Sequence, residues 1–268
     1  MGQSQGRTLQ MVGGGKMGQA LVGGLLEAGW ADPAELTIVE VLAEQRDRLT
    51  DELPGVNVVA DPLADPGVDT VLAVKPHYVV DVCGGLTAPG RVISIAAGIT
   101  IATIEAALPA GTPVIRVMPN TPALVGAGVS GLAPGTNAAD ADLEWAVEVL
   151  GAVGETVVVT EAQLDAVTGM SGSGPAYIFL VAEAMTDAGV RYGLPRPIAA
   201  KLAVNTINGA GRLMTETGTD PVELRAAVTT PAGTTAAGLA ALEDHGLRAA
   251  FSAAVGAATD RSIELGRG

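Results

Sequence analysis

The first residues that could do chemistry are three glycines near the N-terminus, spaced as Gly13-x-Gly15-x-x-Gly18. This spacing is typical of a dinucleotide-binding turn. The first glycine permits the turn, the second lets the backbone approach a pyrophosphate, and the third lets a helix pack on a strand. The motif alone is weak, but here it lies between a β-like run, 8–12, and a helical stretch, 17–28. The N–H groups at the start of that helix would bind phosphate, so we predict a dinucleotide site.

Two other interpretations of this loop are weaker. A Walker A phosphate loop needs glycine five residues before Gly15 and serine or threonine after the lysine, but Gln10 and Met17 occupy those positions. A purely structural glycine-rich turn is left open. We interpret Gly14 as an incidental neighbour. Lys16 stands at a variable position of the motif, where the backbone N–H contributes to binding and the charge is optional.

An acidic residue follows at the position that the same fold uses for the coenzyme ribose. Glu40 ends the next expected strand, 22 residues after Gly18, where a carboxylate would bind the adenosine ribose hydroxyls. It would also repel a 2′-phosphate, which favours NADH. Arg46 and Arg48 could weaken this effect, although a solvated helix face is our interpretation of both. The predicted cofactor is therefore NADPH or NADH.

Three further segments stand where parallel strands are expected to end. They read Ala73-Val74-Lys75-Pro76, Ser94-Ile95-Ala96-Ala97-Gly98 and Met118-Pro119-Asn120-Thr121-Pro122. Ligands bind beyond the carboxyl ends of parallel strands, and small residues and prolines let a flat cofactor lie against rigid backbone. Each segment alone could be an ordinary loop, but their common position at one sheet edge predicts a cleft. The residues predicted to contact the coenzyme are Gly13, Gly15, Lys16, Met17, Gly18, Glu40, Ala73, Val74, Lys75, Pro76, Ala96, Ala97, Gly98, Pro119 and Asn120.

The elements that position these residues alternate along the first half of the chain. Short, nearly continuous apolar runs are expected strands at 8–12, 36–40, 56–59, 70–74, 91–95 and 113–118, with edge strands at 128–133 and 156–159. Such runs are typical of strands buried on both faces of a parallel sheet, and helical stretches between them favour a doubly wound α/β fold. Residues 1–160 are therefore predicted to form a Rossmann-type dinucleotide-binding domain.

The second part of the chain differs in pattern. No convincing strand occurs from 161 to 265, and helical stretches are separated by turns rich in glycine and proline. We predict that residues 161–268 form an all-helical C-terminal dimerisation domain. Stretches such as AAFSAAVGAA, 249–258, are apolar on more than one face, which in a small domain indicates burial against another subunit.

Composition excludes several classes of partner. The net charge of −14 argues against nucleic acid and anionic membranes, both of which need clustered lysine and arginine. One cysteine and two separated histidines provide neither a disulfide framework nor a zinc site, so no metal is expected. No apolar signal core and no run of 18 apolar residues occurs, which predicts a cytoplasmic protein without a membrane span.

Together with segments further along, these motifs resemble the pyrroline-5-carboxylate reductase family, which makes proline. The resemblance runs through almost the whole chain from about Leu9. The last matching segment is the most specific, because VTSPGGTT followed by a small-residue helix is close to a family signature. The matching segments are the glycine loop, VKP at 74–76, AAGI at 96–99, MPNTP at 118–122, DAVTGMSGSGPAY at 165–177, GLPR at 193–196 and VTTPAGTTAAGLAALE at 228–243.

The resemblance implies NAD(P)H-dependent reduction of the cyclic imine Δ1-pyrroline-5-carboxylate to L-proline, by homodimers that often assemble into decamers. It implies that the substrate loop and the coenzyme cleft come from different subunits, and that Thr235 hydrogen-bonds the ring nitrogen. Thr230 stands where serine is usual, and Ala232, where glycine is usual, could reshape the carboxylate site. The implied substrate-binding residues are Thr230, Ala232, Gly233, Thr234 and Thr235, beside Pro231 in the same loop.

The sequence leaves two alternative functions open. A β-hydroxyacid dehydrogenase would use a catalytic lysine in GxGxxxKxxxN; Lys201 and Asn205 match the end of this motif, but Pro195 and Pro197 replace its glycines. A non-catalytic dinucleotide sensor would keep the glycine loop but would not need the segment 228–243. The absence of an informative His/Asp pair suits an imine, because a protonated imine is neutralised by hydride, whereas a ketone requires an acid.

Overall fold

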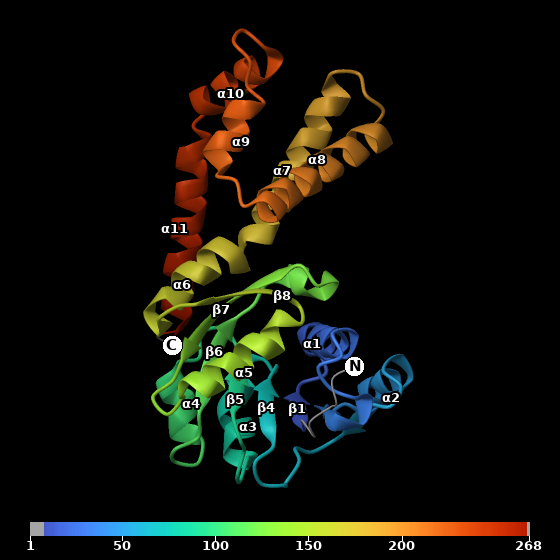
Figure 1. Ribbon diagram of the computed structural model, residues 1–268, viewed down its shortest axis with the longest axis vertical. Helices are drawn as coiled ribbons and strands as arrows, with labels where there is room; N and C mark the ends of the chain where they lie inside the picture. The colour runs from blue at the N-terminus through green and yellow to red at the C-terminus, as the bar shows by residue number, and fades with distance from the viewer. Residues whose placement is uncertain (1–7, 267–268) are drawn as a thin grey trace. The chain divides into compact units, whose positions relative to one another are not determined.

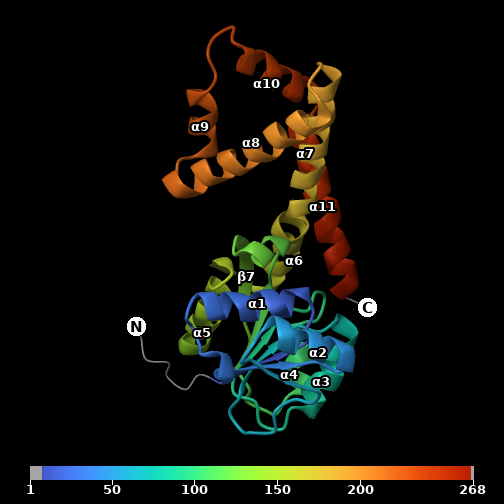
Figure 2. The same cartoon turned by 90° about the vertical axis from the view of Figure 1, so that its right-hand side faces the viewer.

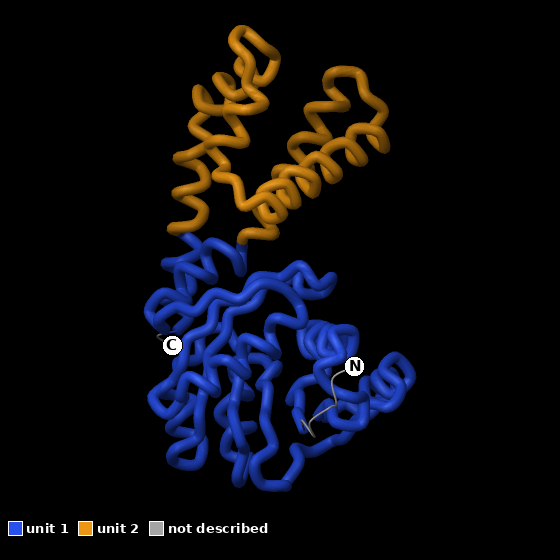
Figure 3. The backbone as a smooth tube through the Cα atoms, in the orientation of Figure 1, with its two compact units in different colours: residues 1–173, 257–268 blue, residues 174–256 orange. Residues whose placement is uncertain are grey.

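The computed structural model describes residues 8–266, which form two compact units. Within this range the first unit comprises residues 8–173 and 257–266, and the second comprises Gly174–Gly256 (Figure 3). The sequence change at residue 160 lies inside the first unit, because a short helix after it, α6 (Leu164–Val167), contacts the sheet. The chain also returns to the first unit after residue 256.

The first unit is built on one eight-stranded sheet in the order β3-β2-β1-β4-β5-β6-β7-β8 (Figure 1). Strands β1 to β6 are parallel to one another, β7 runs antiparallel to β6, and β8 is parallel to β7. The strands are β1 (Leu9–Val12), β2 (Leu36–Val39), β3 (Asn57–Val59), β4 (Asp69–Leu72), β5 (Val92–Ser94), β6 (Val114–Met118), β7 (Gly128–Pro134) and β8 (Gly154–Val158).

One expectation about the sheet is wrong. The strand expected at the edge over 128–133 is the inner strand β7, and of the two late strands only β8 lies at an edge. The antiparallel direction of β7 has a simple cause. The connection from β6 to β7, residues 119–127, contains only a 3₁₀ turn, whereas a parallel return needs a crossover of about a dozen residues or more.

Helices cover both faces of this sheet, as a doubly wound fold requires (Figure 2). Successive strand residues point to opposite sides, so Met11 packs in the core shared with α1, α2 and α5, and Val12 in the core shared with α3 and α4. These helices are α1 (Lys16–Glu27), α2 (Ala43–Glu52), α3 (Val79–Gly85), α4 (Ile101–Ala107) and α5 (Asp140–Gly151).

The second unit is helical throughout, and the expected absence of strands after residue 160 is confirmed for residues 161–266. Over Gly174–Gly256 only Thr186, Ala199 and Ala203 are buried, while large apolar side chains such as Phe179 and Leu180 are 61% and 66% exposed. So small a core cannot stabilise this unit alone. Its helices are α7 (Gly174–Arg191), α8 (Arg196–Thr217), α9 (Pro221–Ala227), α10 (Thr234–Asp244) and the first part of α11 (Leu247–Gly266). Over residues 8–266, no helix combines the length and the apolarity that a bilayer span needs.

Candidate active site

The glycine loop joins the carboxyl end of β1 to the start of α1. Gly13 has φ +114°, and a Cβ there would lie 2.5 Å from the carbonyl oxygen of Ala73. A Cβ at Gly18 would collide with the carbonyl oxygen of Gly13. At Gly15 a Cβ would meet no described atom within 4 Å, which leaves space above the loop for a pyrophosphate. Close backbone contacts therefore explain the glycines at 13 and 18, whereas approach of Gly15 to a pyrophosphate stays a prediction.

Gly14 is not the incidental neighbour that the sequence suggests. A Cβ there would lie 2.6 Å from Cδ1 of Leu49 and 3.2 Å from Oε2 of Glu40. Its carbonyl oxygen accepts hydrogen bonds from Nε2 of Gln19 at 2.6 Å and of Gln45 at 3.1 Å. Helices α1 and α2 thus both fix this residue, which the motif treats as variable.

Glu40 stands directly after β2, and both of its carboxylate oxygens accept backbone hydrogen bonds. Oε2 accepts from the N–H of Gly14 at 3.2 Å, and Oε1 from the N–H of Leu42 at 3.0 Å. The carboxylate is therefore held beside the glycine loop, where the sequence places the adenosine ribose.

Arg46 does not form a solvated helix face, contrary to the sequence interpretation. It is half-buried, and its Nη1 donates to the carbonyl oxygens of Glu40 at 2.8 Å and Val41 at 2.9 Å. It stabilises the loop that presents Glu40. Arg48 does lie on an exposed face, where it pairs with Glu52 at 3.5 Å.

The three unusual strand ends meet at one cavity of 320 Å³. It adjoins the start of α1, so it extends the glycine-loop site across β4, β5 and β6. The crevice for a dinucleotide in this fold lies where the strand order reverses, here between β1 and β4. The lining residues are Met17, Ala73, Val74, Lys75, Pro76, Ile95, Ala96, Ala97, Met118 and Pro119.

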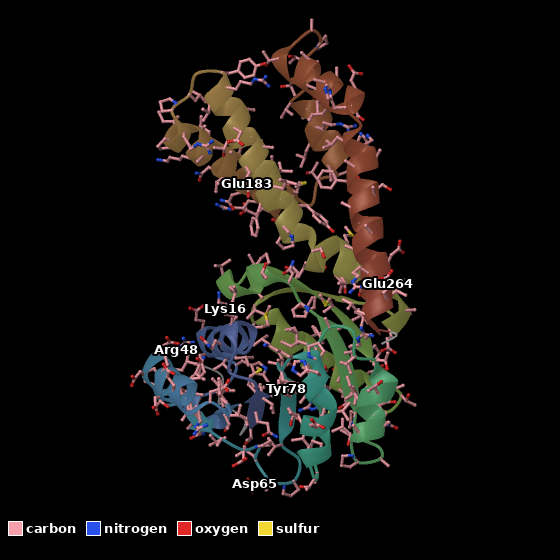
Figure 4. The ribbon with its side chains drawn as sticks, turned by 180° about the vertical axis from the view of Figure 1, so that it is seen from behind. Lys16, Arg48, Asp65, Tyr78, Glu183 and Glu264 are labelled. Carbon is pink, nitrogen blue, oxygen red and sulfur yellow. The ribbon has the colours of Figure 1, made fainter. Side chains whose placement is uncertain are left out.

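Seven predicted coenzyme residues lie outside this lining. Four of them, Gly13, Gly15, Gly18 and Glu40, belong to the glycine-loop site described above, and the other three are Lys16, Gly98 and Asn120. Gly98 lines a neighbouring cavity. Lys16 lies in the first turn of α1 (Figure 4) and lines a third cavity together with Gly23. Asn120 is buried and both ends of its amide are used: Nδ2 donates to the carbonyl oxygen of Ser171 at 3.1 Å, and Oδ1 accepts from the N–H of Val129 at 2.9 Å. Coenzyme contact stays a prediction for every one of these residues, and Asn120 supports the fold of the cleft.

The loop implied to bind substrate lies between α9 and α10. Ala232 is the non-glycine residue with positive φ, 56°, among residues 8–266. The N–H of Gly233 donates to the carbonyl oxygen of Thr230 at 3.0 Å, and Gly233 is the N-cap of α10. A helix N-terminus carries open N–H donors and partial positive charge, which suits a carboxylate.

The other groups that could do chemistry do not line the coenzyme cavity. Nδ1 of His245 lies 2.8 Å from the carbonyl oxygen of Ala241, at the end of α10. Lys201 is exposed, and Nδ2 of Asn205 donates to its carbonyl oxygen at 2.8 Å within α8. Cys83 is fully buried, and burial raises the pKa of its thiol to about 11. Over the described residues, no three His, Cys, Asp or Glu side chains cluster as metal ligands.

A sheet with a glycine loop and a strand-end cleft, followed by a helical unit, defines an oxidoreductase that binds a nicotinamide dinucleotide. Residues 161–265 match the family described as pyrroline-5-carboxylate reductase dimerisation, and residues 8–98 match NADP oxidoreductase coenzyme F420-dependent. The chain belongs to the pyrroline-5-carboxylate reductase family, whose members are NAD(P)H-dependent oxidoreductases of proline biosynthesis.

Full-length relatives support this assignment. The pyrroline-5-carboxylate reductase of Corynebacterium melassecola is 45% identical over 268 residues, covering 97% of this chain and 99% of the relative. The solved reductase from Coxiella burnetii has a TM-score of 0.89 at 34% identity, covering 97% and 99%. The enzyme from Plasmodium falciparum, solved with NADP bound, has a TM-score of 0.83 at 28% identity, covering 98% and 99%.

Proposed function

We propose that this protein transfers hydride from NADH or NADPH to the cyclic imine of Δ1-pyrroline-5-carboxylate, giving L-proline. The observation that supports this most is the convergence of three strand ends on one cavity beside the glycine loop. The full-length relatives, named for this reaction, support the choice of substrate.

The chemistry of the cavity suits an imine. When bound, the dihydronicotinamide ring supplies the hydride. Among the described lining residues Lys75 is the ionisable one, and no carboxylic acid or imidazole is among them. Reduction of a ketone would require an acid for the developing alkoxide. A protonated imine becomes a neutral amine when its carbon accepts hydride, so the lining need not provide a strong acid.

The loop 230–235 is the proposed substrate site. The open N–H groups at the start of α10 and the hydroxyl of Thr230 would bind the substrate carboxylate, and Thr235 would hydrogen-bond the ring nitrogen. We infer that this loop and the coenzyme cleft come from different subunits of a homodimer, which could assemble further into a decamer. The cytoplasmic location stays a prediction.

The direct test is steady-state oxidation of NADH and of NADPH with pyrroline-5-carboxylate, followed by coenzyme absorbance and by detection of proline. We expect turnover that depends on the imine. A folded oligomer that binds a coenzyme but turns over with neither would overturn the proposal and favour a dinucleotide sensor. We expect Lys201→Ala to retain activity. Loss of activity in this variant with intact coenzyme binding would support a β-hydroxyacid dehydrogenase instead.

The exposed apolar side chains of the second unit provide the test of assembly. Phe179 and Leu180 are neighbours on α7 in a unit with almost no core of its own. We expect Leu180→Asp to shift the protein to smaller species in light scattering after size exclusion. Arg48→Asp, on an exposed face of the first unit, is the control. Unchanged assembly in Leu180→Asp would place the subunit contact elsewhere.

A further inference from the structure

A second cavity, of 380 Å³, continues the coenzyme cleft. The two cavities share Pro76 and Ala97, from the segments that follow β4 and β5. Its far wall belongs to the end of α11, where Arg261, Ser262 and Leu265 line it. These residues lie in the same compact unit as the sheet, although they come from the end of the chain (Figure 3).

The last turns of α11 also approach the segment after β5 directly. Gly98 has φ +76°, and a Cβ there would lie 3.5 Å from the carbonyl oxygen of Leu265. The neighbouring residues Ala96 and Ala97 line the coenzyme cavity. The end of α11 therefore packs against the same loop whose other side forms the cleft.

One hydrogen bond between side chains holds this end of α11 in place. The Ser262 hydroxyl donates to Oδ1 of Asp165 at 2.6 Å, and Ser262 is buried. Asp165 belongs to α6, which contacts β6 and β7 and leads directly to Thr168 in the wall of the second cavity. Hydrogen bonds to ionised groups are stronger than those between neutral groups.

We propose that Asp165 and Ser262 are positioning residues for the nicotinamide end of the coenzyme cleft. Glu40 and the strands β1 to β3 form the adenosine half of such a fold, so the half formed by β4 to β6 receives the other mononucleotide. The hydrogen bond fixes the end of α11, this end supports the loop at Gly98, and the loop shapes the wall at Ala96 and Ala97. The inference rests on the proposed dinucleotide function, but its test does not require turnover.

The test compares two ligands in a binding titration: the coenzyme that the wild type prefers, and its fragment without nicotinamide, ADP-ribose or 2′-phospho-ADP-ribose. Ser262→Ala should weaken binding of the whole coenzyme about tenfold, the low end of what such a bond provides, and leave the fragment unchanged. Its kcat should fall too. Asp165→Ala, which removes the acceptor from the other element, should have the same effect, and the double variant should add little.

Two variants separate positioning from general stability. Asp165→Asn keeps an oxygen acceptor for the serine hydroxyl and should bind both ligands as the wild type does. Ser252→Ala, at an exposed position of the same helix, is the control for serine removal. Equal weakening of coenzyme and fragment, or no weakening in either alanine variant at 262 or 165, would overturn the proposal. If the wild type binds coenzyme but reduces no imine, the proposed function fails while this comparison still gives an answer.

Discussion

Replacing Glu40 by serine should shift the coenzyme preference towards NADPH. The carboxylate cannot turn away from a 2′-phosphate without losing its hydrogen bonds to the N–H groups of Gly14 and Leu42. Two unit charges 4 Å apart repel by about 1 kcal/mol in water and about 4 kcal/mol at an effective dielectric constant of 20. Because Glu40 is half-buried, we expect roughly 1.5–3 kcal/mol, which corresponds to a change of about 10- to 150-fold in selectivity.

The quantity to measure is the ratio of kcat/KM for NADPH to that for NADH. Removing Glu40 also frees the N–H of Gly14 and loosens the glycine loop, but this loss affects both coenzymes and cancels in the ratio. Glu44→Ser is the control, because Glu44 is an exposed acid in the first turn of α2. A ratio that moves less than threefold in Glu40→Ser, or equally in the control, would refute the argument.

Three further changes test other parts of the structure. Gly13→Ala should lower both thermal stability and coenzyme affinity, because its Cβ would lie 2.5 Å from the carbonyl oxygen of Ala73. Gly15→Ala should lower coenzyme affinity alone. An equal drop in melting temperature in the two variants would contradict this. Ala232→Val should lower the melting temperature and raise the KM for the imine, because a β-branched residue at positive φ is strained by about 1–2 kcal/mol. Ala232→Gly should change neither the melting temperature nor the KM. Burial raises the pKa of Cys83 from 9.0 to about 11, so its contribution to stability is complete below pH 9 and is lost as the pH rises towards 11. Urea unfolding at pH 8 and pH 10 should show this loss in the wild type, and a loss just as large in Cys83→Ala would exclude the thiol as its cause.

The sequence predicts those parts of the fold that depend on local patterns. Strands such as β1 and β2 carry apolar residues on both faces, and all of their residues are buried. The glycines at 13 and 18 are predictable because the turn itself requires them. The direction of β7 was also within reach, because the connection that precedes it is too short for a crossover.

Contacts between distant segments have no local pattern in the sequence that would predict them. The constraint on Gly14 comes from Glu40, Gln45 and Leu49, on elements that periodicity places correctly but cannot orient. The hydrogen bond between Asp165 and Ser262 joins residues 97 positions apart. Each looks like an ordinary polar helix residue in the sequence. Asp165 and Ser262 come together only because the chain returns to its first unit after residue 256.

This return also sets the order in which a newly synthesised chain can complete its site. Domains generally fold as units while the ribosome is still adding residues. The glycine loop and the inner strands could assemble early, but residues 257–266 are translated after the whole helical unit. A nascent chain or a truncated product that lacks them would therefore carry a dinucleotide fold with an open wall. If the end of α11 positions the nicotinamide as proposed, full competence for hydride transfer would arise only after the last turns of α11 have been translated.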